Sequence, residues 1–317
     1  MKKQNIPQTM QAVVIENWGG PEVLQTKTVS LPEIQPDEIL IEVNSAGISP
    51  FDLHMRDGWY KNSYQLPMIL GWDLSGVIVA IGSDVSKFKI GDVVFAHCNV
   101  YRNGGAYAQY TAVKESEVTL KPTAVSHEEA VAACMNGLTA WQALFDVAHL
   151  HAGQKILVHA AAGGVGHIAV QLAKWKGAHV IGTASKRNEK FLQELGVDEV
   201  IDYAHIPFEK AVHNVDVVLD TLGQNVLLKS FEIVKKGGIV VSIVDFENIK
   251  QAQHFGIRGE NVVVSPNPHQ LSEIAQLLME KKIKPHIAAT FPLEEVAQAH
   301  RYIESGHTRG KVVLKNK

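Results

Sequence analysis

A glycine-rich turn between a strand-like run and a helix-like run constrains the fold of this chain more than any other feature. The turn, Ala-Ala-Gly-Gly-Val-Gly, occupies residues 161–166 and follows an apolar run at 155–159. Beyond it, apolar residues recur at the spacing of one helix face, and a second apolar run follows at 179–182. The residues that share the helix face are Val165, Ile168, Ala169 and Leu172. This order predicts a strand–helix–strand unit with the turn at its first junction.

In such a unit the turn is a binding site for a phosphate group. Free backbone N–H groups and the positive end of the helix dipole face a ligand placed there. The G-x-G-x-x-G pattern of dinucleotide-binding turns is met, with Ala161 in the first place and Gly163 and Gly166 in the other two. A turn that only packs strand against helix is the alternative. The complete strand–helix–strand setting favours a bound dinucleotide.

In the remaining sequence, the pattern of predicted secondary structure changes near residue 126. From about 10 to 122, short apolar runs bounded by Gly, Pro and Asp predict a β-rich domain. After about 126, strand-like and helix-like segments alternate, which predicts a doubly wound parallel sheet of the Rossmann type. The later segments predicted as strands of this sheet are 199–201, 215–219, 238–242 and 262–264.

The last part of the chain is predicted to complete the first domain. A helical segment at 269–281 precedes a closing strand at 310–314 that is able to return to the β-rich domain. We therefore predict an α/β protein of two domains. Residues 1–124, completed by 266–317, form the β-rich domain, and residues 125–265 form the Rossmann domain.

Composition argues against several classes of function. A net charge of -3 lacks the basic excess that binding to a nucleic-acid backbone needs, so nucleic acid is not an expected partner. The first seven residues lack the apolar core of a signal peptide, and no apolar stretch approaches the length of a membrane span. We expect a cytoplasmic protein without membrane contact. Cys98 and Cys134 are too few for a disulfide framework or a cysteine-rich metal site.

The end of the second Rossmann strand favours NADP(H) over NAD(H). Sites specific for NAD place an acid about 20 residues beyond the glycines, where it binds the ribose 2'-hydroxyl. Here the strand ends without an acid, in Gly-Thr-Ala-Ser-Lys-Arg at 182–187. The Ser185 hydroxyl and the charge of Lys186 or Arg187 suit a 2'-phosphate. Alternatively, the two cationic residues are solvated side chains that open the next helix.

Several ordered motifs together resemble one enzyme family over essentially the whole chain. The motifs lie at 11–14, 47–52, 71–78, 136–141, in the glycine turn and at 307–314. With them the chain resembles the zinc-independent, zeta-crystallin-like quinone oxidoreductases of the medium-chain dehydrogenase/reductase superfamily. The resemblance implies a GroES-like catalytic domain, made from the N-terminal part and the C-terminal return, and a Rossmann domain for the cofactor. It also implies a homodimer, for which a strand at 261–264 offers an edge.

Zinc alcohol dehydrogenases of the same superfamily allow a test for a metal. In the resemblance, Ser49 and Trp72 occupy the places of a cysteine and a histidine zinc ligand. A hydroxyl and an indole cannot replace thiolate and imidazole around Zn²⁺. The structural zinc lobe needs four cysteines after the strand at 91–94, where only Cys98 lies. We therefore expect no metal.

The missing metal points to a particular class of substrate. Without a Lewis acid, an alcohol is hard to oxidise because its alkoxide has no stabiliser. A quinone or an α,β-unsaturated carbonyl compound instead spreads the incoming hydride charge onto its own oxygen. We predict an NADPH-dependent reductase of such compounds. An enoyl-thioester reductase, in which Tyr60 is the acid, and an NADPH-binding regulatory protein without turnover are the alternatives.

The resemblance also assigns candidate site residues. Ser49, His54 and Tyr60 fall beside the nicotinamide and the substrate, and Tyr60 is placed to stack on the substrate, hydrogen-bond it or donate a proton. Loop residues that satisfy local hydrogen bonds are the alternative reading of His54 and Tyr60. The residues predicted to contact the cofactor are Thr139, Ala162, Gly163, Gly164, Val165, Ser185, Lys186, Tyr203, Leu222 and Ile243.

Overall fold

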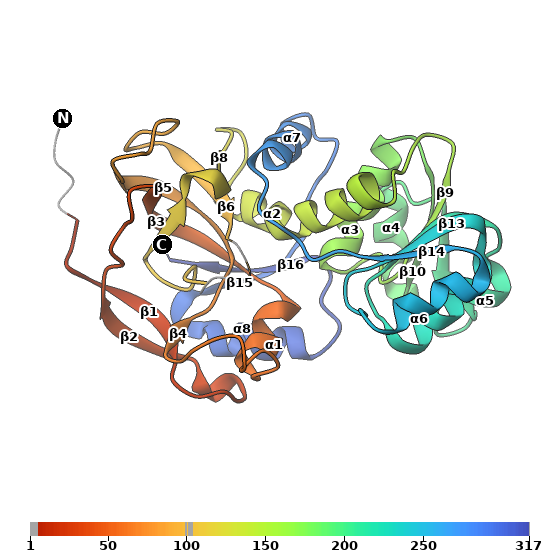
Figure 1. Cartoon of the computed structure of the whole chain (residues 1–317), viewed down its shortest axis with the longest axis horizontal. Helices are drawn as coiled ribbons and strands as arrows, with labels where there is room; N and C mark the ends of the chain where they lie inside the picture. Colours follow the sequence, from red (N-terminus) through yellow and green to blue (C-terminus); the bar gives the residue numbers. More distant parts are fainter. Residues whose placement is uncertain (1–5, 99, 101–103, 317) are drawn as a thin grey trace. The chain divides into compact units, whose positions relative to one another are not determined.

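The chain divides into two compact units in a computed structural model that describes residues 6–98, 100 and 104–316 (Figure 1). The first unit comprises 1–135, 265–279 and 286–317, and the second comprises 136–264 and 280–285. The predicted boundaries at 124/125 and 265/266 differ from this division, because 125–135 lie in the first unit and 280–285 in the second. The start of the helix at 127–141 belongs to the first unit because Met135 N donates a hydrogen bond to the Asp73 carboxylate.

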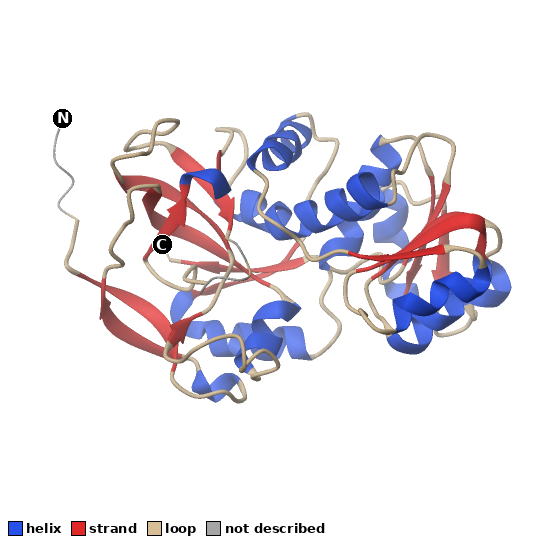
Figure 2. Ribbon diagram, in the orientation of Figure 1, coloured by secondary structure: helices blue, strands red, loops and turns tan. Residues whose placement is uncertain are grey.

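Strands dominate the first unit, where the described residues form two sheets (Figure 2). The small sheet consists, in spatial order, of β2 (Gln25–Ser30), β1 (Thr9–Ile15) and β4 (Met68–Ile69). The large sheet consists, in spatial order, of β15 (Ile287–Pro292), β16 (Lys311–Lys315), β3 (Glu38–Ile48), β5 (Asp73–Ile81), β6 (Val93–His97) and β8 (Val118–Leu120), with β7 (Tyr110–Lys114) also paired to β3. The helices are α1 (Pro50–Arg56), the start of α2 (His127–Trp141), α7 (Pro268–Met279) and α8 (Val296–Glu304).

The C-terminal strand β16 returns to this sheet, as predicted. It pairs antiparallel with β3, with Leu314 opposite Ala46, and parallel with β15 on its other side. The large sheet thus contains segments from both ends of the sequence. The C-terminal segment is therefore part of the strand-rich first unit.

A buried ion pair links three strands of the large sheet to α2. The Asp73 carboxylate at the start of β5 accepts hydrogen bonds from Lys311 Nζ (2.9 Å), His97 Nδ1 (3.1 Å) and Met135 N (3.1 Å). The side chains of Asp73 and Lys311 are each only 2% exposed. Burial opposes ionisation of Asp73, yet Lys311 and His97 hold the pKa of this carboxyl below its ordinary value. The charged group therefore acts as a cross-link in the interior of the unit.

Parallel strands form the sheet of the second unit, and helices lie on both sides of it (Figures 1 and 2). The strands are, in spatial order, β11 (Glu199–Asp202), β10 (His179–Ala184), β9 (Lys155–Val158), β12 (Val215–Asp220), β13 (Val234–Ser242) and β14 (Arg258–Asn261). The helices that begin in this unit are α3 (Gly164–Trp175), α4 (Glu189–Glu194), α5 (Phe208–Ala211) and α6 (Gln224–Ser230). Counted from β9, the strand order is the 3-2-1-4-5-6 of the Rossmann fold, which confirms the predicted fold class.

The edge strand β14 lies earlier in the sequence than predicted. The prediction placed a strand at 262–264, whereas the residues that pair with β13 are Arg258–Asn261. Apolarity does not identify this strand, because a strand at the edge of a sheet pairs on one side only and tolerates polar residues. The apolar residues Val262 and Val264 are buried in the segment that follows the strand.

No helix in the described part of the chain has both the length and the apolar character needed to cross a membrane.

Candidate active site

The glycine turn lies where β9 meets α3. The strand ends at Val158, and the helix begins at Gly164 with Gly163 as its N-cap. No side chain caps the helix start, and no acidic residue lies in its first turn. The first N–H groups of a helix have no acceptor within the helix. The start of α3 therefore combines uncapped N–H groups with the positive dipole end, and this arrangement fits a pyrophosphate.

Close contacts explain the choice between glycine and alanine in this turn. A Cβ atom on Gly166 would lie 2.3 Å from the carbonyl oxygen of Ala160, and one on Gly163 would lie 3.1 Å from the same atom. Ala161 replaces the first glycine of the pattern, and its methyl group faces Gly182 in β10. A Cβ atom on Gly182 would lie 2.8 Å from that methyl carbon. Gly182 thus provides the space that lets alanine occupy the first place.

The predicted cofactor residues of the sheet line its carboxyl edge in spatial order. Each one comes directly or almost directly after the end of a strand. In the order of neighbouring strands they are Tyr203 after β11, Ser185 after β10, the glycine turn after β9, Leu222 after β12 and Ile243 after β13. Ligands of open α/β sheets bind at this edge. The topology therefore brings together segments that are up to 82 residues apart in the sequence, from Ala161 to Ile243.

The end of this edge that is predicted to bind the adenosine contains an acid that the sequence reading missed. Tyr203 N donates a hydrogen bond to Ala184 O (3.3 Å), which brings Tyr203 next to Ser185. Lys186 forms an ion pair with Glu189 (2.5 Å). Asp202 is paired in register with Ala184, and its carboxylate binds His205 Nδ1 (2.7 Å), which holds its pKa below the ordinary value. An acid thus reaches this end from β11 rather than from β10.

Asp220 is a second residue that the sequence reading missed, and it organises two of the loops. Its buried carboxylate accepts hydrogen bonds from Leu222 N (3.1 Å), Gly223 N (2.9 Å) and Ser242 Oγ (2.7 Å). Its backbone oxygen accepts from Ile243 N (3.1 Å). One residue therefore positions the segments after β12 and β13. An aspartate that ends the apolar run Val-Asp-Val-Val-Leu-Asp was the available signal.

The other predicted cofactor residues belong to the same unit. Thr139 is buried in α2, and Ala162 is buried in the turn. Gly163, Gly164 and Val165 are half-buried, so the backbone at the start of α3 remains partly accessible. The cofactor roles of these residues remain predictions from the resemblance.

A neutral histidine lies directly before the turn. His159 is buried between the end of β9 and α6, and burial lowers its pKa to about 4. Its Nε2 faces Ser230 Oγ (2.8 Å), and its Nδ1 faces Thr183 Oγ1 (3.1 Å). The serine hydroxyl donates to Val226 O (2.7 Å), so it can only accept from the imidazole. His159 is therefore the neutral tautomer that carries its proton on Nε2.

We expect this imidazole not to titrate between pH 5 and pH 8 in the folded protein, as followed by NMR of its ring signals. The unfolded chain takes up a proton near the ordinary pKa of 6.5, whereas the folded protein does so only near pH 4. The free energy of unfolding therefore falls as the pH falls through this window. His159 contributes a loss of about 2 kcal/mol between pH 7 and pH 5. A His159→Phe variant should lack this part of the slope, and a titration midpoint above pH 6 would contradict the assignment.

In the first unit, Ser49 has a structural role at the start of α1. Ser49 is the N-cap residue, and both its N (2.8 Å) and its Oγ (2.7 Å) donate to Oδ2 of Asp52. Asp52 is fully buried, and this burial raises its pKa to about 6, although the hydrogen bond from Ser49 acts in the opposite direction. The Ser49 hydroxyl is thus held by the helix that it begins.

The other two predicted catalytic residues lie among aromatic side chains: Tyr60 belongs to an aromatic cluster with Phe51 and Trp72, and His54 forms a stacked pair with Trp59. Tyr60 is 40% exposed, and its ring centroid lies 5.5 Å from that of Phe51. His54 stacks on Trp59 with 3.9 Å between centroids, and its partial burial lowers its pKa. Phe51 packs edge-on against the buried Trp72. Of this cluster, Tyr60 presents an exposed aromatic ring, which is the kind of flat surface that packs against a conjugated molecule.

The residues at the two zinc positions do not fit a metal ion. The Ser49 hydroxyl is bound to Asp52, and Trp72 is 1% exposed beneath Phe51. Among the described residues, no group of three or more histidine, cysteine or acidic side chains is placed to hold a metal. Cys98 and Cys134 are buried and are not joined in a disulfide. Side-chain chemistry and packing therefore both argue against zinc coordination at these positions.

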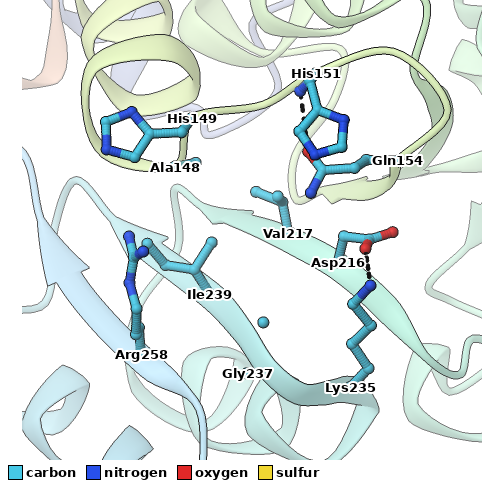
Figure 3. Close-up of a pocket in the computed structure, with 11 residues that line it drawn as sticks. Ala148, His149, His151, Gln154, Asp216, Val217, Lys235, Gly237, Ile239 and Arg258 are labelled. Atoms are coloured by element: carbon cyan, nitrogen blue, oxygen red, sulfur yellow. Dashed lines mark hydrogen bonds and ion pairs between the residues drawn. The ribbon is translucent and has the colours of Figure 1, made fainter.

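A cavity of about 310 Å³ lies at the opposite edge of the Rossmann sheet (Figure 3). It is lined by residues at the starts of strands and in the loop before β9, among them His149, Gln154 and Arg258. Figure 3 also shows Lys235 paired with Asp216 in its wall. No predicted cofactor residue lines it. The cavity is therefore separate from the carboxyl edge that holds the glycine turn.

Comparisons with known proteins agree with this architecture. The family model described as "Alcohol dehydrogenase GroES-like domain" matches residues 35–123, and the one described as "Zinc-binding dehydrogenase" matches 195–314. An NADPH-dependent alkenal/one oxidoreductase of Arabidopsis thaliana is 33% identical, covering 98% of this chain and 80% of the relative. A quinone oxidoreductase of Pongo abelii is 31% identical, covering 96% and 97%.

A solved structure gives the same result. The quinone oxidoreductase from Coxiella burnetii is 35% identical, covers 98% of this chain and 100% of its own, and superimposes with a TM-score of 0.94. The predicted GroES-like and Rossmann-type domains are confirmed by these matches, and a nicotinamide cofactor follows from them. The chain is an oxidoreductase that belongs to the quinone oxidoreductase family of the medium-chain dehydrogenase/reductase superfamily.

Proposed function

We propose that this protein is an NADPH-dependent reductase of quinones or α,β-unsaturated carbonyl compounds. The observation that carries the proposal is the start of α3, which is uncapped, free of acid and centred on the carboxyl edge of the sheet. The names of the relatives support the substrate class. The aromatic cluster of the first unit supports a flat, conjugated substrate.

The reaction balances without a metal. A dihydronicotinamide cofactor held at the glycine turn 161–166 would supply one hydride, and water would supply one proton. A quinone takes up both and becomes a hydroquinone, whereas an enone takes the hydride at its β carbon and the proton at its α carbon. The protein's part is to orient the two reactants and to donate hydrogen bonds to the substrate oxygen. Tyr60 is half-exposed in the aromatic cluster and carries the hydroxyl that we assign to this contact.

The test is NADPH oxidation by the purified protein with a panel of quinones, enals, enones and enoyl-thioesters, with NADH run in parallel. We expect turnover with at least one quinone or enone. Turnover with enoyl-thioesters alone would favour the enoyl-thioester reductase. Tight binding of NADPH without turnover on any compound would overturn the proposed activity and favour a regulatory protein.

The preference for NADPH is proposed from Ser185 and Lys186 at the end of β10. We expect Lys186→Gln to raise the Kd for NADPH about tenfold and to leave the Kd for NADH unchanged, because only NADPH carries the 2'-phosphate. The matched control is Lys190→Gln in α4, whose side chain is 89% exposed. Equal effects on both cofactors, or a wild-type preference for NADH, would contradict the assignment and implicate Asp202 as the partner of the ribose hydroxyl.

We also propose a homodimer, as inferred from the resemblance. The support is that β14 ends the sheet order and has an unpaired side among the described strands. The edge is formed by Arg258–Asn261 and not by the predicted 261–264. Sedimentation of the purified protein tests the state, and a monomer at micromolar concentration would reject it.

A further inference from the structure

We propose that His159 is a positioning residue for the pyrophosphate of the dinucleotide, and that it acts through Thr183 on the peptide of Ala160. The inference rests on the proposed cofactor binding at the glycine turn. It concerns His159, Ala160 and Thr183, which lie outside the G-x-G-x-x-G pattern at 161–166. Three observations carry it: the backbone conformation of Ala160, the hydrogen-bond chain of the imidazole and the anchoring of His159 itself.

Ala160 is the residue around which the turn is built. Its φ of +45° lies in the left-handed region, which costs an alanine about 1–2 kcal/mol. Its carbonyl oxygen accepts a hydrogen bond from Gly163 N (2.8 Å) and approaches the position of Gly166 so closely that no Cβ fits there. A rotation of the Ala160 peptide would therefore move the backbone at the start of α3.

A chain of hydrogen bonds from His159 holds this peptide. Ala160 N donates to Thr183 Oγ1 (3.2 Å), so the threonine hydroxyl is free to direct its own proton at Nδ1 of the imidazole (3.1 Å). This assignment requires Nδ1 to be an acceptor, and the contact with Ser230 independently makes Nε2 the donor. Every donor in the chain then has one acceptor.

His159 itself is anchored from several sides. Its backbone N donates to Leu219 O (3.0 Å), and its backbone O accepts from Thr221 Oγ1 (3.0 Å). Its ring meets the edge of Phe208 with 4.6 Å between centroids. The backbone and the imidazole of His159 thereby connect strands β9, β10 and β12 and helix α6. A ring held in this way is able to stabilise a backbone conformation that is unfavourable on its own.

Breaking this hydrogen-bond chain should affect cofactor binding and not the chemical step. If the chain is broken, the Ala160 peptide relaxes and the N–H groups of the turn spread over several orientations. The cofactor must then order them when it binds, which raises its Kd and its KM. The value of kcat at saturating cofactor should change little, because none of these side chains contacts the reacting atoms in this proposal.

The experiment compares Thr183→Val with Thr183→Ser. Valine keeps the size and branching of threonine without its hydroxyl, whereas serine keeps the hydroxyl. We expect Thr183→Val to raise the Kd for NADPH about tenfold, which corresponds to about 1.4 kcal/mol, and Thr183→Ser to remain within about twofold of wild type. His159→Phe should weaken binding to the same extent. The double variant Thr183→Val with His159→Phe should bind NADPH no more weakly than either single variant, because each substitution breaks the same hydrogen-bond chain.

A second readout uses the protein without cofactor. Amide hydrogen exchange of the segment around Ala160 should be faster in Thr183→Val than in Thr183→Ser, while urea unfolding confirms that both variants are folded. Equal Kd values and equal exchange in the two threonine variants would overturn the inference. Failure of the wild-type protein to bind NADPH or NADH would instead refute the proposed function, so the two failures are distinguishable.

Discussion

Replacing Lys311 by methionine is expected to lower the free energy of unfolding by about 3–5 kcal/mol. Lys311 and Asp73 form an ion pair of 2.9 Å in which both side chains are 2% exposed. Methionine is similar in length to the lysine stem, so the loss comes mainly from an aspartate that stays buried without its counter-charge. His97 and Met135 N still contact Asp73, but neither supplies a permanent positive charge. Urea unfolding at pH 7 measures the difference.

A control on the same strand, β16, distinguishes the loss of a buried ion pair from the loss of any positive charge. Lys315 pairs with Glu128 at the surface, with side-chain exposures of 45% and 22%. Lys315→Met should therefore change the free energy of unfolding by less than about 1 kcal/mol. The double variant Lys311→Met with Asp73→Asn should recover part of the stability, because it removes the uncompensated charge. If Lys311→Met and Lys315→Met lowered the free energy of unfolding equally, the buried ion pair would contribute no more to stability than the surface pair.

The parts of the fold that could be predicted from sequence are those set by local pattern. The glycine turn and the alternating segments after it identified the Rossmann sheet, since its central strands β9, β10 and β12 are mostly buried and read as apolar runs. The cofactor residues that follow these strands could be placed for the same reason. In a parallel sheet all strand ends meet at one edge, so order in the sequence and topology suffice.

The parts that could not be predicted depend on long-range pairing. Asp220 joins the segments after β12 and β13, and Asp202 lies beside the end of β10 from the neighbouring strand β11, but neither contact has a local pattern. The strand β14 was misplaced because its pairing residues are polar while the next three are apolar. Residues 125–135 lie in the first unit, where Met135 N contacts Asp73, a residue 62 positions earlier in the sequence, and no local pattern indicates such a contact.

Ser49 illustrates how a family resemblance leaves the role of a residue open. The resemblance placed this residue at a ligand position and predicted a catalytic role. In the structure its hydroxyl and its N–H both donate to Asp52, which is an N-terminal capping arrangement of α1. A resemblance to a family predicts where a residue lies in the fold. The partner that the side chain contacts depends on the neighbouring residues of this particular chain.

Gly166→Ala is expected to weaken cofactor binding by about 30- to 100-fold and to lower the free energy of unfolding by about 1–3 kcal/mol. The added methyl carbon would lie 2.3 Å from the Ala160 carbonyl oxygen and 2.8 Å from Ala161 Cα, and both are backbone atoms. Backbone cannot rotate out of the way as a flexible side chain does, so α3 or the turn has to shift. Fluorescence titration with NADPH and urea unfolding measure the two effects.

Gly163→Ala is the matched control within the same turn. Its methyl carbon would lie 3.1 Å from the same carbonyl oxygen, a contact that a shift of a few tenths of an ångström relieves, and its φ of -76° suits alanine. We expect at most about a fivefold change in the Kd for NADPH, and little loss of stability. If both variants lost binding equally, bulk at the turn rather than the position of the Ala160 peptide would govern affinity. If the Kd for NADPH of Gly166→Ala instead exceeded that of Gly163→Ala tenfold or more, the close approach of α3 to the end of β9 would be what sets cofactor affinity. Gly166 is the residue that permits this approach.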